Sequence, residues 1–332
     1  MIRLTLVIPI YNAELYLRDC LDCIYASNIE ENNFQVICVN DCSTDNSRDI
    51  VLEYQMKHQN LQLIDHVENR RAGGARNTGI CSAKGEWVWF VDADDTIEHM
   101  ALKEILYYCQ KENLDALCFN YKLMYENKTV EKHIFNVSSD VQSGVDFLCT
   151  TFGENLIYHL GFPWRTIFRR SILLEHRVCF PEQLLYGEDT TFMVEGLMYA
   201  KRVKAINSVL YNYRQDVTNS SSTQLVDMRG ERIYESIFCA GDLIVNLKDR
   251  AKNLSLELSE SLEKGLPWFV NRLFMRLVKT STEERREFYN RLDNKECLLI
   301  YMNIHNRLLV RYPLIGKNLL RLLSIIYKIK HK

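Results

Sequence analysis

The chain has 332 residues, of which 47% are hydrophobic and 25% charged, and these values are typical of a globular protein of about two domains. A formal net charge of −2 argues against a nucleic-acid partner, because nucleic-acid binders carry a basic excess. Eleven cysteines, an odd number scattered without paired spacing, indicate reduced thiols in a cytoplasmic protein.

The first 112 residues alternate between predicted strands and helices. Apolar runs of the kind buried on both faces of a parallel sheet lie at residues 4–10, 34–39, 61–64 and 87–91. Apolar residues recur at helical spacing after the first run, and Gly73 begins a helix that is expected to reach Ala83. This alternation predicts an α/β fold with a doubly wound, mainly parallel sheet and flanking helices.

The regular alternation ends after a further strand at residues 115–124. A mixed segment follows, with a late strand at residues 203–213, and the chain beyond Ser220 is predicted to be helical to its end. We therefore expect a first domain over residues 1–222, with halves at 1–112 and 113–222, and a helical C-terminal extension over residues 223–332.

Polar residues follow three of the predicted strands at their carboxyl ends, where ligands bind in open α/β sheets. They are Asn12, Asp41 and the acidic turn 92–95, which holds three carboxylates within four residues. Carboxylates this close repel one another unless a cation lies between them, and hard oxygen ligands suit Mg²⁺ or Mn²⁺ carrying a diphosphate. The alternative is a solvated acidic turn that caps a helix starting near Thr96.

Five sequence blocks carry a family resemblance: IPIYNAE, VNDCSTDNS, GGARNTGI, KGEWVWFVDADD and YGEDTTF. In this order they resemble glycosyltransferase family 2, whose nucleotide-diphospho-sugar fold is called GT-A, over about the first two-thirds of the chain. The resemblance implies inverting transfer of a sugar from a nucleotide-diphosphate donor, commonly UDP-linked, to an acceptor hydroxyl, with Mn²⁺ or Mg²⁺ as cofactor. It makes residues 1–112 the nucleotide-sugar-binding half and residues 113–222 the acceptor-binding half.

The resemblance assigns donor contacts to the turns after the first two strands. The first turn contributes Pro9, Tyr11, Asn12 and Glu14, although Glu14 is equally suited to capping the following helix. Asp41 matches the carboxylate that accepts the N3–H of uracil, and an ionised aspartate is a pure acceptor. Its neighbour Asn40 departs from the family's usual second aspartate, which leaves the choice of base open.

The acidic turn and the preceding helix receive the remaining donor roles. Asp92 matches the residue that faces the ribose, Ala93 lies beside it in the same contact, and Asp94 matches the direct metal ligand. Asp95 is expected to orient that ligand. The last two donor contacts are Arg76, on a helix whose amino end should face the diphosphate, and Arg71, for which a plain surface charge is slightly favoured.

The second acidic pair, Glu188 and Asp189, is assigned to catalysis. Displacement at the anomeric carbon needs a base that takes the proton of the attacking hydroxyl, and Asp189 is expected in this role, with Glu188 as the alternative or as an acceptor contact. An amino-terminal helical turn rich in acids is the structural alternative. Trp164 is predicted to line the acceptor pocket or, equally, to lie in the core. Residues 213–214 and 220–222 resemble a flexible loop over the diphosphate.

The C-terminal region contains basic amphipathic segments. Residues 311–332 carry six Lys and Arg and no acid, with Lys317, Arg321 and Lys328 on one stripe, and residues 268–279 repeat the pattern. Such helices predict peripheral contact with an anionic membrane, and the alternative is packing on the catalytic domain. Because no signal peptide or spanning helix is recognised, we expect a cytoplasmic protein at the inner face of the plasma membrane.

The sequence thus predicts a metal-dependent, inverting glycosyltransferase with a nucleotide-sugar donor, a UDP-sugar being favoured. The acceptor is expected to be a lipid-linked glycan in the synthesis of a bacterial surface polysaccharide such as a capsule, exopolysaccharide or O-antigen. One alternative is a catalytically inactive relative that binds nucleotide sugars or partners at the membrane. A nucleotidyltransferase is disfavoured because IPIYNAE lacks the Gly-rich, basic loop that such an enzyme needs after its first strand.

Overall fold

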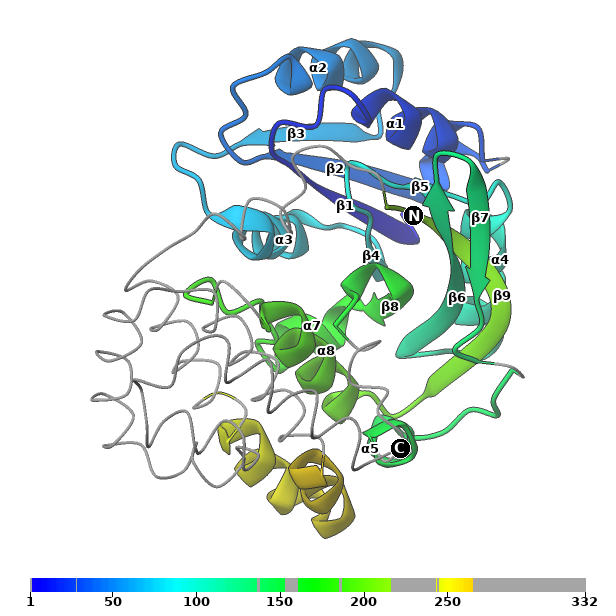
Figure 1. The fold of residues 1–332 in the computed structure, drawn as a ribbon, viewed down its shortest axis with the longest axis vertical. Helices are drawn as coiled ribbons and strands as arrows, with labels where there is room; N and C mark the ends of the chain where they lie inside the picture. The colour runs from blue at the N-terminus through cyan, green and yellow to red at the C-terminus, as the bar shows by residue number, and fades with distance from the viewer. Residues whose placement is uncertain are drawn as a thin grey trace, which may run out of the picture.

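The structure is a computed structural model that describes residues 2–27, 29–135, 138–152, 161–184, 187–215, 243 and 245–264 (Figure 1). Its centre is one mixed sheet in the order β3-β2-β1-β4-β8-β6-β9-β5, with β7 paired to β6. The strands are β1 (Leu4–Ile10), β2 (Phe34–Asn40), β3 (Leu61–Asp65), β4 (Trp87–Phe90), β5 (Thr96–Ile97), β6 (Ala116–Tyr125), β7 (Lys128–Lys132), β8 (Thr166–Arg169) and β9 (Val203–Arg214).

Helices cover both faces of this sheet (Figure 1). The face that carries Leu4, Leu6 and Ile8 of β1 packs against α1 (Leu17–Tyr25), α2 (Ser47–Lys57) and α4 (Ala101–Lys111). The opposite face, which carries Val7, packs against α3 (Arg71–Ser82), α5 (Gly144–Phe152), α7 (Arg170–Glu175) and α8 (Glu188–Tyr199). Successive strand residues point to opposite faces, so a continuous apolar run such as β1 fills both cores. Two short 3-10 helices, η1 (Glu31–Asn33) and η2 (Pro163–Arg165), precede β2 and β8.

The first four strands form the predicted parallel half. β1 pairs in parallel with β2 and β4, and β2 pairs in parallel with β3. The carboxyl ends of these strands therefore lie at one edge of the sheet, where the turns that follow β1, β2 and β4 meet. This confirms the predicted α/β architecture and the edge at which a site was expected.

The second half is mixed rather than parallel. β8 runs antiparallel to β4 and β6, whereas β9 runs parallel to β6 and antiparallel to β5. The strand β5 begins at Thr96 directly after the acidic turn, and α4 begins only at Ala101. The alternative in which the acidic turn caps a helix near Thr96 is therefore wrong.

The described part of the C-terminal region is helical over residues 245–254 and 256–264. Leu247, Ala251, Leu258 and Leu262 join the same core cluster as α8. Residues 268–279 and 311–332, on which the membrane prediction depends, lie outside the described residues. Within the described part of the chain, none of the helices combines the length and the hydropathy needed to span a bilayer.

Candidate active site

The turns after β1 and β2 are joined by side-chain hydrogen bonds. The backbone N–H of Asn12 donates to Ser43 Oγ (3.1 Å), and the side-chain Oδ1 of Asn12 accepts from the backbone N–H of Thr44 (2.8 Å). Glu14 Oε2 accepts from the backbone N–H of Asn46 (3.0 Å), which is the N-cap residue of α2. Glu14 therefore satisfies the amino end of α2 rather than that of α1, the following helix for which a cap was considered. Asn12 adopts a φ of 51°, which asparagine tolerates better than most residues.

Pro9 and Tyr11 lie on either side of the last residue of β1 and differ in exposure. Pro9 lies within β1, in register with Val39 of β2, and is half-buried. Tyr11 is 43% exposed directly beyond the strand. Its ring is therefore available to a ligand at the carboxyl edge of the sheet, whereas Pro9 mainly shapes the end of the strand.

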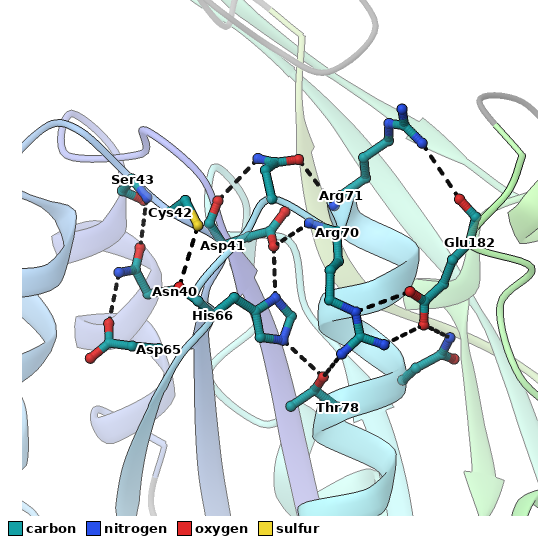
Figure 2. A network of polar contacts seen from close by, with 12 residues as sticks. Asn40, Asp41, Cys42, Ser43, Asp65, His66, Arg70, Arg71, Thr78 and Glu182 are labelled. Atoms are coloured by element: carbon teal, nitrogen blue, oxygen red, sulfur yellow. Dashed lines mark hydrogen bonds and ion pairs between the residues drawn. The ribbon is translucent and has the colours of Figure 1, made fainter. Parts of the chain in front are cut away.

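Asp41 is almost fully buried, with 2% of its surface exposed, and its two oxygens differ (Figure 2). Oδ1 accepts from the backbone N–H of Arg70 (2.8 Å) and lies 2.7 Å from Nδ1 of His66. Because a carboxylate only accepts, Nδ1 carries the hydrogen in this contact. Oδ2 is buried and has no hydrogen-bond partner among the described residues. The structure thus leaves one acceptor for an incoming N–H donor, as the uracil assignment requires.

His66 was not singled out from the sequence, although its position could have indicated it. It directly follows β3 and so lies at the same carboxyl edge as Asp41. Asn40, the departure from the family pattern, donates through Nδ2 to Asp65 Oδ1 (2.8 Å), as Figure 2 shows. Arg48 pairs with the same carboxylate (3.0 Å). An aspartate at position 40 would face Asp65 with like charge, so the amide suits this particular neighbour.

The three carboxylates of the acidic turn have different surroundings. Asp95 is fully buried; its Oδ2 accepts from the Tyr211 hydroxyl (2.8 Å) and its Oδ1 from the Arg214 N–H (2.7 Å). Asp92 Oδ1 accepts from Arg76 Nη2 (2.7 Å). Asp94 forms no ion pair with a described cation, and burial together with Asp92 raises its pKa to about 6. Asp94 is therefore the carboxylate of this turn that has no ion-pair or side-chain hydrogen-bond partner among the described residues, which suits an external cation.

The contacts of Asp95 fix the acidic turn to β9. The Tyr211 hydroxyl also accepts from the Asp92 N–H (3.0 Å), and Arg214 Nε donates to the Asp94 carbonyl oxygen (2.9 Å). Asp95 thus has the supporting position expected of it. Arg214 belongs to β9, so residues 213–214 are part of a strand and the loop prediction for them is wrong; residues 220–222 lie outside the described residues.

Arg76 joins the two acidic groups. Its guanidinium donates through Nη2 to Asp92 and through Nη1 to Asp189 Oδ1 (2.9 Å), and the side chain is 4% exposed. The guanidinium lies 5.3 Å from the ring centroid of Phe180. Arg76 is the sixth residue of α3 rather than one of its first turn. Its guanidinium therefore holds two carboxylates, and the donor contact expected of Arg76 stays a prediction.

Glu188 and Asp189 begin α8, after Gly187 at a φ of 83°. The position is the acid-rich helix start named as the structural alternative, and it is also joined through Arg76 to the acidic turn. Burial raises the pKa of Asp189 well above its ordinary value; Arg76 opposes this, while Glu188 and Asp92 add to it. Burial likewise raises the pKa of Glu188. A carboxylate with a raised pKa is a stronger base, which suits proton abstraction.

Three further residues named from the sequence lie away from the acidic groups or expose only their backbone. Trp164 is 2% exposed and stacks on Tyr211 at 4.3 Å, so it lies in the core and not on the surface of an acceptor pocket. Ala93 is also buried, with 6% exposed, so only its backbone can approach a donor. Arg71 has a φ of 60° and directs its guanidinium to the Glu182 carbonyl oxygen (3.5 Å), as Figure 2 shows.

The residues present fit a metal that arrives with its substrate. Among the described residues there is no cluster of three or more His, Cys, Asp or Glu side chains that could hold a metal ion. Mg²⁺ is commonly bound by one or two carboxylates together with substrate phosphates and water. Asp94, which forms no ion pair with a described residue, fits such a site, whereas both oxygens of Asp95 and one oxygen of Asp92 already accept bonds from protein donors.

Comparisons with known proteins agree with this geometry. A family model described as Glycosyl transferase family 2 matches residues 5–176, more than half of the chain. The chain is 31% identical over 236 residues to the putative glycosyltransferase EpsH of Bacillus subtilis (strain 168), covering 70% of this chain and 65% of that protein. It is 31% identical over 212 residues to a poly(ribitol-phosphate) beta-glucosyltransferase of Bacillus spizizenii, covering 64% of this chain and 32% of that protein.

Among solved structures, S. aureus TarS 1-349 in complex with UDP-GlcNAc superposes with a TM-score of 0.73 at 25% identity. The superposition covers 94% of this chain and 87% of that chain. By contrast, the chain spans only about a third of the glucosyltransferase and just under two thirds of EpsH.

Proposed function

The chain belongs to glycosyltransferase family 2, and from this premise we propose that it is a metal-dependent, inverting transferase that moves a sugar from a UDP-sugar to an acceptor hydroxyl. The observation that carries the proposal is the bridge of Arg76 between Asp92 and Asp189. It joins Asp92, the carboxylate on the donor side, and Asp189, the candidate base, to one buried guanidinium. A structural ion pair alone would not need a third carboxylate, Asp94, left without a counter-charge two residues away.

Recognition of the uracil base is assigned to Asp41. Its buried Oδ2 has no described partner, while His66 and Arg70 hold Oδ1. A base that offers an N–H, such as uracil at N3, satisfies this acceptor, whereas cytosine at N3 presents a second acceptor and leaves both unsatisfied. The UDP-GlcNAc complex of the similar TarS structure supports a uridine nucleotide.

The diphosphate is expected beside the acidic turn. Asp94 would hold the Mn²⁺ or Mg²⁺ ion, which when bound supplies positive charge to the leaving diphosphate. Asp95 keeps Asp94 in place through the turn's bonds to Tyr211 and Arg214. Asp92, held by Arg76, is directed to the ribose, and the exposed Tyr11 ring borders the same edge.

Asp189 is the proposed base. It takes the proton of the acceptor hydroxyl while that oxygen bonds to the anomeric carbon and the bond from this carbon to the diphosphate oxygen breaks, which inverts the configuration. Transfer of this kind needs one carboxylate base and no separate carboxylic acid. Arg76 orients Asp189 through the 2.9 Å contact, and Glu188 is left to contact the acceptor.

The acceptor is proposed to be a glycan or polyol-phosphate hydroxyl of a bacterial surface polymer, lipid-linked while it is extended. The name of the poly(ribitol-phosphate) beta-glucosyltransferase supports this class of acceptor. Such an acceptor lies at the membrane, and the basic stripe of residues 311–332 is the proposed point of peripheral contact with anionic lipid at the inner face.

The test is release of free nucleotide from UDP-, GDP- and dTDP-sugars, with and without Mn²⁺, by wild type and three variants. We expect turnover of a UDP-sugar only with metal, loss of metal-dependent donor binding in Asp94→Ala, and donor binding without turnover in Asp189→Ala. Asp49→Ala, an exposed acid on α2, is the matched control and should behave as wild type. Donor binding without turnover by wild type would instead indicate an inactive, binding relative, and no binding of any donor would refute the proposal.

A further inference from the structure

Arg70 contacts both Asp41 and Glu182, which belong to two distant parts of the chain (Figure 2). Its backbone N–H donates to Asp41 Oδ1 (2.8 Å). Its guanidinium donates two hydrogen bonds to Glu182, from Nε to Oε2 (3.0 Å) and from Nη2 to Oε1 (2.6 Å). Glu182 lies 112 residues further along the chain and shortly before Glu188 and Asp189. A bidentate pair of this kind fixes orientation as well as distance.

Asn77 holds the same distant segment to α3. Its Nδ2 donates to the Phe180 carbonyl oxygen (2.8 Å) and to Glu182 Oε1 (3.1 Å), and its Oδ1 accepts from the Phe180 N–H (2.8 Å). The Phe180 ring in turn stacks on Phe192 of α8 at 3.9 Å. The segment that leads into Glu188 and Asp189 is therefore attached to α3 by its backbone, by Glu182 and by an aromatic contact.

Two glycines leave room for this segment on α3. A Cβ at Gly73 would lie 3.2 Å from Phe180 Cβ and 3.8 Å from Glu188 Cγ, and one at Gly74 would lie 3.2 Å from Glu182 Oε2. Positions 70, 73, 74 and 77 recur at helical spacing, so Arg70, both glycines and Asn77 share one face. Phe180, Glu182 and Glu188 lie against that face.

A second link runs from Asp41 into the same helix. His66, bonded to Asp41 through Nδ1, lies with Nε2 at 2.8 Å from Thr78 Oγ1, and Arg70 Nη1 donates to the same hydroxyl (3.3 Å). The base-recognition carboxylate is thus attached to α3 both at its start and at its eighth residue. Helix α3 is the common support of Asp41 and of the Glu188–Asp189 pair.

We propose that Arg70 and Glu182 are positioning residues that set the Glu188–Asp189 pair relative to the nucleoside held at Asp41, with α3 as the rigid spacer. The inference rests on the proposed function for what is bound and transferred. It assigns no contact with substrate to either residue, and it makes their pair responsible for the geometry between donor and base. Small displacements of a base from its hydroxyl cost about 10²-fold in rate, so loss of the pair should appear in turnover rather than in affinity.

Glu182 forms no contact with Asp41, and Arg70 bonds Asp41 directly only through its backbone N–H; the Arg70 side chain reaches Asp41 indirectly, through Thr78 and His66. Glu182→Gln and Arg70→Gln should each lower kcat for UDP release from UDP-GlcNAc or UDP-glucose by about 10- to 100-fold. The Kd for UDP should stay within about threefold of wild type, because the two groups that bond Asp41 directly, the Arg70 backbone N–H and His66 Nδ1, are unchanged. The double variant should be no slower than the slower single variant, since both remove one interaction. The exchanged pair Arg70→Glu with Glu182→Arg should recover part of kcat.

Glu53→Gln is the matched control, because Glu53 forms an equally bidentate pair with Arg18 between α1 and α2 (2.7 and 3.0 Å), away from this segment. It should leave kcat and Kd unchanged. Amide hydrogen exchange of peptides covering 178–184 and 187–192 should accelerate in Glu182→Gln and not in Glu53→Gln. A kcat of Glu182→Gln within threefold of wild type, or a Kd for UDP that weakens in step with kcat, overturns the proposal. If wild type neither binds UDP nor turns over a donor, the proposed function fails, and unchanged exchange in Glu182→Gln then separately overturns the positioning role.

Discussion

Replacing Arg76 by methionine is the most direct perturbation of the site. Methionine keeps an unbranched apolar stem against Phe180 but removes the guanidinium from Asp92 and Asp189. Removing one partner of a fully buried ion pair costs about 3–5 kcal/mol, because the remaining charge is left uncompensated. The Asp92 and Asp189 side chains are 26% and 27% exposed, so water screens part of this loss. We therefore expect about 2–3 kcal/mol of destabilisation at neutral pH.

The pH dependence of this loss has a definite sign. Burial already raises the pKa of Asp189, and the charge of Arg76 is the main opposing cause, so Arg76→Met raises this pKa further. The uncompensated charge exists only while the carboxylate is ionised. The destabilisation is consequently largest at high pH and shrinks as the pH falls and Asp189 binds a proton. For the same reason the acid limb of the pH–rate profile should move to higher pH in any residual activity.

Urea denaturation at pH 8 and at pH 5.5 measures both expectations. Arg48→Met is the matched control: Arg48 is 50% exposed and pairs with Asp65 at the surface, so its loss should cost less than about 1 kcal/mol and depend little on pH. The reasoning is refuted if Arg76→Met unfolds as easily as Arg48→Met at pH 8, or if its deficit grows towards pH 5.5.

Three further outcomes are expected. Asp41→Asn must keep an oxygen facing His66 and Arg70, which turns its Nδ2 towards the ligand; UDP affinity should fall at least about tenfold and CDP affinity should rise, as measured by calorimetry. Tyr211→Phe removes the bonds to the acidic turn and should cost about 1–3 kcal/mol in urea, and a loss below 0.5 (roughly the error of the method) would contradict the role given to it. Gly79→Ala would place a Cβ 2.1 Å from a methyl carbon of Val7 in β1; a thermal melt should show a loss of about 1–3 kcal/mol, and an unchanged Tm would show that the helix shifts freely.

The parallel half of the fold could be predicted from the local sequence pattern. The runs at β1 and β2 are apolar on both faces, which occurs where helices cover both sides of a sheet, and the structure has this arrangement. The short strands β5, β7 and β8 were not predicted, because they have no distinctive periodicity of their own. β8 is defined by its antiparallel pairing with β4 and β6, and such partners are far away in the sequence.

The site was predicted unevenly. The carboxylates at strand ends were found because an acid after a buried strand is chemically conspicuous. Arg76 was placed on the right helix, but its bonds to Asp92 and Asp189 were not predicted, because both partners are distant in the sequence. His66, Arg70 and Glu182 were missed, since an ordinary polar residue becomes informative only when its partner is known.

The sequence by itself determined to which family the chain belongs and predicted at which strand ends a site lies, because both depend on residue types at short spacing. Only the tertiary structure shows which of the acids in the turn are paired with protein donors. Asp94 lacks a counter-charge while Asp95 is held by Tyr211, and this difference arises from strand β9, more than a hundred residues away. Charge compensation is a property of neighbours in space, and those neighbours are set by the packing of the whole sheet.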